Sequence, residues 1–279
     1  MDKINIYAFA DEADSCVDGQ IAAMKRNALD GLEIRGVDGT NIADISVEKA
    51  KEVKAKLDQA GLVTWSVGSP IGKIHITDDF AAHKDKLKKT LEIANVLQAE
   101  NMRVFSFYIP ENEAAAKYKT QVAEYLAQMC EIAKPYGVKL CHENEKGIYG
   151  DIPERCLELY QAIPALKGIF DPANFVQCGV DTLKAWELLQ EYIYYMHIKD
   201  AKADGMIVPA GNGIGNIREL AKRYIARGGK HFTMEPHLME FDGLKGLERE
   251  NEQSVISAFC FKDNNEAFDA GCLAFKKLI

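Results

Sequence analysis

Residues 138–171 read VKLCHENEKGIYGDIPERCLELYQAIPALKGIFD and contain one complete strand–helix–strand unit. A short apolar run ends in Glu143, and a second one ends in Asp171. Between them, Pro153 marks the first turn of a helix, where a missing backbone N–H costs little. A helix that connects two strands predicts a parallel pair, and each predicted strand ends on a carboxylate.

The same alternation of strand and helix patterns runs through the 279 residues. The eight predicted strands lie at 4–9, 31–35, 63–67, 103–107, 138–143, 168–171, 194–198 and 231–235. Eight strand–helix units in a chain of this length predict a single (β/α)8 barrel domain over 1–279, with an open doubly wound sheet as the alternative. The stretch 236–262 fits the pattern poorly, so we expect an extended loop or lid there and a last helix at 265–278.

Composition narrows the class of protein. With 47% hydrophobic and 27% charged residues the chain is globular, and its apolar runs are too short to span a membrane. The net charge of −8 opposes binding to nucleic acid. Seven cysteines without CxxC pairs predict reduced thiols and no structural zinc, and a start without a signal-peptide pattern predicts a cytoplasmic protein.

Four successive predicted strands end in residues that bind metals. These are Glu143, Asp171, His197 and Glu235. Active sites of barrels lie at the carboxyl ends of the strands, where these side chains would meet. Each residue alone could be a strand cap or a rim ion pair, but four equivalent positions favour one divalent metal site. An oxygen-rich set suits Mn²⁺ foremost, with Mg²⁺, Co²⁺ or Zn²⁺ as alternatives.

Other polar residues near these strand ends are candidates for substrate binding. They are Glu33, Arg35, Glu145, Asn174, Lys199 and His237. Glu33 and Arg35 could equally form a structural ion pair, whereas Lys199 could stabilise a developing oxyanion. Three glycines at 211, 213 and 215 could offer amides to a phosphate, but a flexible turn is favoured because no GxGxxG pattern is present.

The strings CHENE (141–145), FDPANF (170–175), HIKD (197–200) and MEPHL (234–238) resemble the sugar phosphate isomerase/epimerase family of xylose isomerase-like barrels. AFADE (8–12), GLEIRGVDG (31–39) and VGSPIGKI (67–74) extend the likeness over nearly the whole chain. The resemblance implies a metal held by the four strand-end residues, with Glu143 and Glu235 exchanging a proton with the substrate. The ketose epimerases of this family carry a histidine and an arginine where this sequence has Asn174 and Ala203, so that substrate group is not implied.

These observations predict a metal-dependent isomerase or epimerase of a small sugar or polyol, phosphorylated or not, which works through an enediolate. A dehydratase of a cyclic polyol or related acid would use the same site and is the main alternative. A metal-dependent endonuclease on the same barrel would need several zinc ions and more histidines than the six present, and Asn174 stands where such an enzyme has a histidine. A non-catalytic binding barrel is the remaining alternative, but it would not need the complete set of metal ligands. The resemblance also implies a homo-oligomer, either a dimer or a tetramer.

Overall fold

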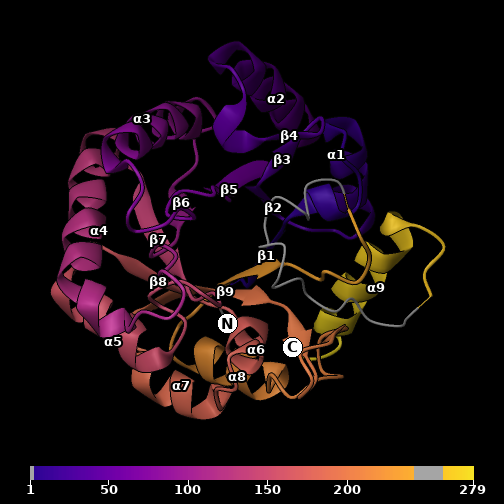
Figure 1. Cartoon of the computed structure of the whole chain (residues 1–279). Coiled ribbons are helices and arrows are strands. Elements are labelled where there is room, and N and C mark those ends of the chain that lie inside the picture. The colour runs from indigo at the N-terminus through magenta and orange to yellow at the C-terminus, as the bar shows by residue number, and fades with distance from the viewer. Residues whose placement is uncertain (1–2, 242–259) are drawn as a thin grey trace.

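The computed structural model describes residues 3–241 and 260–279. Eight parallel strands close into a barrel in the order β1-β12-β9-β8-β7-β6-β5-β2, which confirms the predicted barrel and excludes the open sheet (Figure 1). The strands are β1 (Asn5–Ala8), β2 (Gly31–Ile34), β5 (Val63–Val67), β6 (Asn101–Val104), β7 (Lys139–Glu143), β8 (Lys167–Phe170), β9 (Ile193–Ile198) and β12 (His231–Met234).

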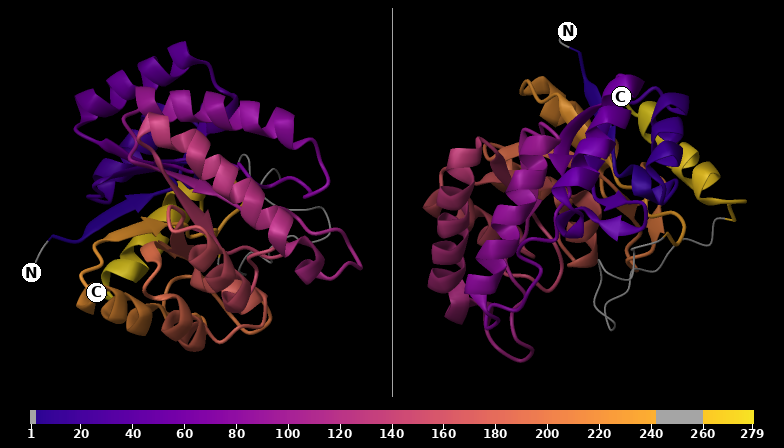
Figure 2. Two further views of the ribbon diagram at one scale, coloured as in Figure 1. Left: turned by 90° about the vertical axis from the view of Figure 1, so that its left-hand side faces the viewer. Right: turned by 90° about the horizontal axis from the view of Figure 1, so that it is seen from above.

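Helices surround this barrel on its outer side (Figures 1 and 2). They are α1 (Val17–Arg26), α2 (Val47–Ala60), α3 (Phe80–Val96), α4 (Lys119–Ala133), α5 (Pro153–Ala162), α6 (Pro172–Gln177), α7 (Thr182–Leu189), α8 (Ile217–Ala226) and α9 (Asn264–Lys276). Helix α2 illustrates the pattern, because its apolar stripe of Ala50, Val53 and Leu57 is buried. Ser46 caps its start and Gly61 ends it in the left-handed conformation.

Strand β6 ends three residues earlier than the sequence predicts. The predicted strand covered 103–107, but β6 spans Asn101–Val104. Beyond Val104 the backbone pairs with the loop after β5, since the Phe105 N–H donates to the Ile71 carbonyl at 2.8 Å and the Phe107 N–H donates to that of Gly72 at 3.0 Å. Phe107 adopts a positive φ of 65°, which is incompatible with a strand.

Two other local predictions differ from the structure by one residue. A glycine after a helix pattern predicts a left-handed cap at Gly229, but the positive φ in the turn after α8 falls at Gly228. The last helix begins at Asn264, one residue before the predicted start. Most of the predicted lid at 236–262 lies outside the described residues, which omit 242–259.

Four aromatic rings stack across the amino-terminal end of the barrel. Trp65 of β5 lies 4.8 Å from Tyr7, 4.1 Å from His231 and 5.9 Å from Tyr194 between ring centroids. Strand β5 is not a neighbour of β9 or β12 in the sheet, so these contacts cross the barrel interior. The polar side chains discussed below therefore lie toward the opposite end.

Two short hairpins extend the carboxyl-terminal face. They are formed by β3 (Gly36–Val37) with β4 (Thr40–Asn41), and by β10 (Asp200–Ala201) with β11 (Ile207–Val208). Within the described ranges, every helix is too short or too polar to cross a bilayer.

Candidate metal centre

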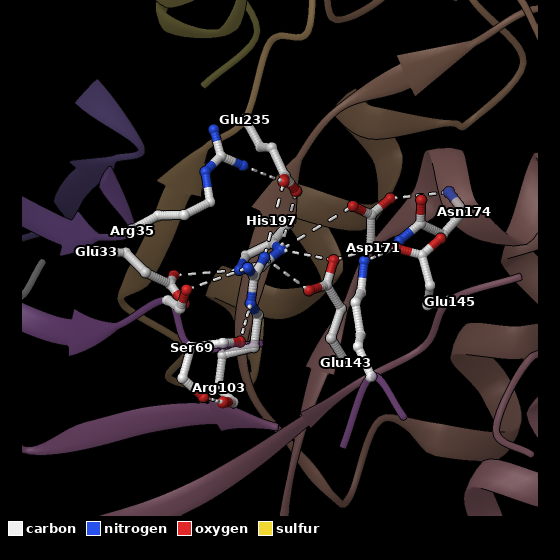
Figure 3. Close-up of polar contacts among 12 residues, drawn as sticks. Glu33, Arg35, Ser69, Arg103, Glu143, Glu145, Asp171, Asn174, His197 and Glu235 are labelled. Atoms are coloured by element: carbon white, nitrogen blue, oxygen red, sulfur yellow. Dashed lines mark hydrogen bonds and ion pairs between the residues drawn. The ribbon is translucent and has the colours of Figure 1, made fainter. Parts of the chain in front are cut away.

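The four predicted ligands meet at the carboxyl ends of four consecutive strands. Glu143 ends β7, Asp171 follows β8, His197 lies in β9 and Glu235 follows β12. One ligand atom from each lies within 4.8 Å of all the others, and every one of these residues is buried (Figure 3). The prediction that these side chains come together is therefore confirmed.

His197 lies at the centre of this cluster (Figure 3). Its Nδ1 is 3.1 Å from Glu143 Oε1, 3.2 Å from Glu235 Oε2 and 4.0 Å from Asp171 Oδ2. Asp171 Oδ2 is buried and forms no hydrogen bond, although the ammonium of Lys199 lies near it. Three carboxylates, one imidazole and an unsatisfied carboxylate oxygen fit a divalent ion.

The three carboxyl groups of the cluster differ in the direction in which their pKa values are shifted. Burial raises the pKa of Asp171 to about 7, and the nearby carboxylates of Glu235 and Glu143 act in the same direction. Burial also opposes ionisation of Glu143, but His197 and Arg103 outweigh it and lower that pKa to about 2. The pKa of Glu235 is likewise held well below its usual value, because the nearby cations overcome the effect of burial.

Glu33 lies beneath His197 and not at the open face of the cluster. Its Oε2 is 3.1 Å from His197 Nε2, and its other oxygen accepts hydrogen bonds from the hydroxyls of Tyr195 at 2.8 Å and Ser66 at 3.3 Å. The side chain is fully buried. Glu33 therefore fixes the ring of His197 and directs Nδ1 toward the other three ligands.

Arg103 is a site residue that the sequence reasoning missed. Its Nη1 lies 3.0 Å from Glu143 Oε2 and 3.8 Å from Glu235 Oε1. The rest of the guanidinium donates to the carbonyls of Gly68 and Ser69. The available signal was a charged residue between the apolar Met102 and Val104 in a strand that is buried throughout.

Lys199 contacts the part of the cluster formed by Asp171 and Glu235. Its Nζ lies 3.1 Å from Asp171 Oδ2 and 3.4 Å from Glu235 Oε2, and only 5% of the residue is exposed. The next residue, Asp200, anchors the loop that follows. Its carboxylate accepts from the backbone N–H groups of the three glycines at 211, 213 and 215 at 2.8 to 3.0 Å. These amides are thus occupied by an internal anion, as expected for a structural turn.

Arg35 has carboxylate partners of its own. Asp11 binds it through both oxygens at 2.9 and 3.0 Å, and Glu12 Oε1 lies 3.3 Å away. Arg35 Nη1 also donates to Glu235 Oε1 at 3.1 Å. Asp11 and Glu12 were quoted in the sequence motif but not assigned to the site.

Asn174 and Asn144 hold the ends of β7 and β8 together. The Asn174 amide donates to Glu143 Oε1 at 3.2 Å and to the Asn144 carbonyl at 2.9 Å. The Asn144 side chain exchanges two hydrogen bonds of 2.9 Å with the backbone of Asp171. Asn174 therefore touches a predicted ligand directly, and Asn144 is a further residue that sequence reasoning missed.

The remaining two candidates differ in position. His237 Nε2 is buried without a hydrogen bond, 3.4 Å from Glu235 Oε1 and 3.3 Å from Glu12 Oε1. Glu145 forms an ion pair of 3.1 Å with Lys73 of the loop after β5, and among the described residues it makes no ion pair with the four candidate ligands. The structure thus brings five of the six predicted substrate-binding residues to the cluster.

The chain is thus a closed parallel barrel with a buried Glu/Asp/His cluster, a candidate metal site, at the carboxyl ends of its strands. The sequence profile of the xylose isomerase-like TIM barrel family matches residues 21–276. The chain belongs to that family. A search of curated protein sequences found no significant match.

Several solved structures share the fold. A probable 3-DHS dehydratase, AsbF of Bacillus anthracis, is 16% identical, with 98% of each chain covered and a TM-score of 0.73. D-psicose 3-epimerase of Clostridium cellulolyticum, solved with D-tagatose, is 14% identical with 98% of each chain covered and a TM-score of 0.74. The IOLI protein with a bound zinc atom is 12% identical, covering 99% of this chain and 98% of its own, with a TM-score of 0.74.

Proposed function

We propose that this protein is a divalent-metal-dependent isomerase or epimerase of a small sugar or polyol. The proposal rests on the two buried glutamates that approach His197 Nδ1 from different strands, Glu143 at 3.1 Å and Glu235 at 3.2 Å. Both carboxyl groups have lowered pKa values, so each is ionised and able to accept a proton. Family membership and the similarity of the fold to D-psicose 3-epimerase support the same chemistry.

Glu143, Asp171, His197 and Glu235 would hold the ion, and the oxygen-rich set favours Mn²⁺ over Mg²⁺, Co²⁺ or Zn²⁺. A divalent ion bound there would polarise a substrate carbonyl and stabilise negative charge developing on its oxygen. Glu33 orients His197, and Asn174 orients Glu143 through the hydrogen bond at Oε1.

The proton transfer is assigned to the two glutamates. One glutamate removes the proton from the carbon beside the carbonyl, which leaves an enediolate. If the other glutamate returns a proton to the opposite face of that carbon, the centre is inverted and the reaction is an epimerisation. If the proton returns to the neighbouring carbon, an aldose and a ketose are interconverted. Lys199 is placed to stabilise the negative charge of the enediolate.

A dehydratase of a cyclic polyol or related acid is the second candidate. Lys199 is compatible with it, because a buried ammonium 3.4 Å from Glu235 Oε2 could stabilise negative charge that develops on a departing hydroxyl group. The dehydratase among the structural neighbours covers 98% of this chain. A dehydratase would release water and leave a conjugated carbonyl compound, which absorbs in the ultraviolet.

The test is exchange of the substrate's α-proton with deuterated water, measured by NMR with free and phosphorylated ketoses and cyclic keto-polyols. Exchange should collapse in Glu143→Gln, Glu235→Gln or both, while a metal titration shows that the ion still binds. His197→Ala is the contrasting variant, because it should lose the ion and regain part of its activity at high metal concentration. Undiminished exchange in both glutamine variants would mean that the bases are wrongly assigned.

A further inference from the structure

Strand β5 contains one residue more than its neighbour β2 where the two strands pair. Thr64 pairs with Leu32 and Ser66 pairs with Glu33, so Trp65 is inserted between the two pairs. Successive side chains of a regular strand point to opposite faces of the sheet, and an inserted residue breaks this alternation. As a result, both the Trp65 ring and the Ser66 hydroxyl face the barrel interior, where the ring joins the aromatic stack and the hydroxyl bonds to Glu33.

Strand β9 has a corresponding insertion relative to β8. Tyr195 pairs with Ile169 after a register shift, so Tyr194 is the inserted residue. The two inserted rings, those of Trp65 and Tyr194, stack with 5.9 Å between their centroids. The residues that follow them, Ser66 and Tyr195, place their hydroxyl oxygens 3.3 Å apart. The two insertions therefore bring together two hydroxyl groups from strands that are not neighbours in the sheet.

Both hydroxyl groups donate to the same oxygen of Glu33. Its Oε1 accepts from Tyr195 at 2.8 Å and from Ser66 at 3.3 Å, whereas its Oε2 lies 3.1 Å from His197 Nε2. All four side chains are fully buried, so bulk water cannot replace a donor that is removed. A buried carboxylate oxygen without a donor is costly. The two hydroxyl groups therefore hold the carboxylate in the rotation that directs Oε2 at His197.

The rotation of this carboxylate determines which nitrogen of His197 is available to a cation. An acceptor at Nε2 keeps a proton there and leaves the Nδ1 lone pair directed at the three carboxylates of the cluster. If Glu33 turned away, the ring could carry its proton on either nitrogen. The apparent affinity for a cation falls in proportion to the fraction of molecules that are ready to bind it.

We propose that Ser66 and Tyr195 are positioning residues that set the affinity of the cluster for a divalent ion, because they hold Glu33 against His197. Among the described residues, the hydrogen bonds of both hydroxyls go to Glu33 and to each other. The inference rests on the proposed function in one respect, since it takes the cluster to hold such an ion. It does not depend on which reaction the ion assists.

The test is the affinity for Mn²⁺, measured without substrate by competition with a chromogenic chelator. Tyr195→Phe and Ser66→Ala should each weaken binding about three- to tenfold, as expected for one net hydrogen bond. The double variant should lose more than either single variant, because Oε1 of Glu33 then has no donor. Circular dichroism and the Tm of the metal-free protein show first that each variant is folded, and Ser66→Ala carries the test if Tyr195→Phe does not fold.

Two matched controls remove a hydroxyl group elsewhere in the barrel. Tyr7→Phe makes the same change in a buried ring at the amino-terminal end, where the hydroxyl oxygen lies 3.3 Å from His231 Nδ1. Thr64→Val changes a residue of β5 whose buried hydroxyl has no hydrogen-bond partner in the described part of the chain. Both controls should bind Mn²⁺ like the wild-type protein.

The dependence on Glu33 distinguishes positioning from a general structural role. In a Glu33→Gln background, Tyr195→Phe should cause no more than about a twofold further loss, because the carboxylate through which the hydroxyl acts is absent. An equal loss with and without Glu33 would overturn the inference. Wild-type affinity in both Tyr195→Phe and Ser66→Ala would also overturn it.

The outcomes separate this inference from the proposed function. If the hydroxyl variants bind Mn²⁺ like the wild-type protein and a sugar still exchanges its α-proton, the positioning role fails and the isomerase stands. If the variants bind Mn²⁺ more weakly through Glu33 but no sugar exchanges a proton, the positioning role stands and the proposed isomerase or epimerase activity fails. A wild-type protein that binds no divalent ion would overturn both.

Discussion

Glu33 and His197 form a buried pair in which the carboxylate Oε2 lies 3.1 Å from the imidazole Nε2. The opposite ring nitrogen, Nδ1, faces Glu143, Asp171 and Glu235. A proton held on Nε2 by Glu33 leaves the Nδ1 lone pair free for a cation.

Glu33→Gln should therefore weaken metal binding without removing a ligand. We expect a loss of about 10- to 100-fold in affinity, as for other carboxylates that orient a metal-bound histidine. The measurement is competition for Mn²⁺ with a chromogenic chelator. Glu145→Gln is the control, because that carboxylate forms its ion pair with Lys73 and not with one of the four candidate ligands. Equal affinities for wild type and Glu33→Gln would show that the pair does not orient the ring.

Metal binding should stabilise the folded protein, since the ligands converge only in the folded state. At a hundredfold excess over the dissociation constant, binding contributes about 2.7 kcal/mol, which corresponds to a rise in Tm of roughly 5 to 10 °C. The rise should disappear in His197→Ala. A melting temperature that does not respond to any divalent ion would count against the metal centre, as would full activity after chelation.

His83 gives a pH dependence that is independent of the metal centre. Its Nε2 accepts a hydrogen bond of 2.8 Å from the Gly72 N–H, and burial lowers its pKa to about 4. The neutral form is therefore required in the folded state, whereas the unfolded chain binds a proton near pH 6.5. This stability is fully present above pH 6.5 and declines as the pH falls toward 4.

We expect wild type to lose about 2 kcal/mol more than His83→Gln between pH 8 and pH 5, because glutamine does not titrate and can still accept the bond. Urea unfolding of both proteins at the two pH values, with chelator present, measures this difference. Parallel pH profiles would show that His83 does not contribute.

Asp200→Ala should destabilise the loop that follows Lys199. It would leave the N–H groups of Gly211, Gly213 and Gly215 without their acceptor. The expected cost is about 2 to 3 kcal/mol, and it should be smaller in Asp200→Asn, which keeps one oxygen. Unfolding free energies test this, and an unchanged value for Asp200→Ala would mean that water replaces the carboxylate.

The convergence of the four candidate ligands could be predicted because each directly ends an apolar run or closely precedes its end, and parallel strands align those ends. Arg103 could not be predicted in the same way. The sequence suggested a strand at 103–107, which put Arg103 at the amino end, far from the four candidate ligands. The loop at Ile71 and Gly72 takes the backbone bonds of Phe105 and Phe107, so β6 ends at Val104 and Arg103 comes next to the cluster.

Glu33 shows a second limit of sequence reasoning. It precedes Arg35 by two residues, and both were predicted to bind substrate. In the structure Glu33 lies deeper in the barrel than the four candidate ligands. It accepts a hydrogen bond from the hydroxyl of Tyr195, which precedes His197 by two positions on β9. Whether a strand residue faces a ligand or supports another side chain depends on the stagger between strands, which a single sequence does not contain.

The rings of Trp65, Tyr7, His231 and Tyr194 have a kinetic consequence. They fill the barrel at the end opposite to the cluster, so water and substrate share the carboxyl-terminal opening. While substrate occupies that opening, a proton taken up by a buried glutamate is shielded from bulk solvent. If a single glutamate both removes and returns the proton, as in the interconversion of an aldose and a ketose, part of the isotope label removed from the substrate should then reappear in the product of the same turnover.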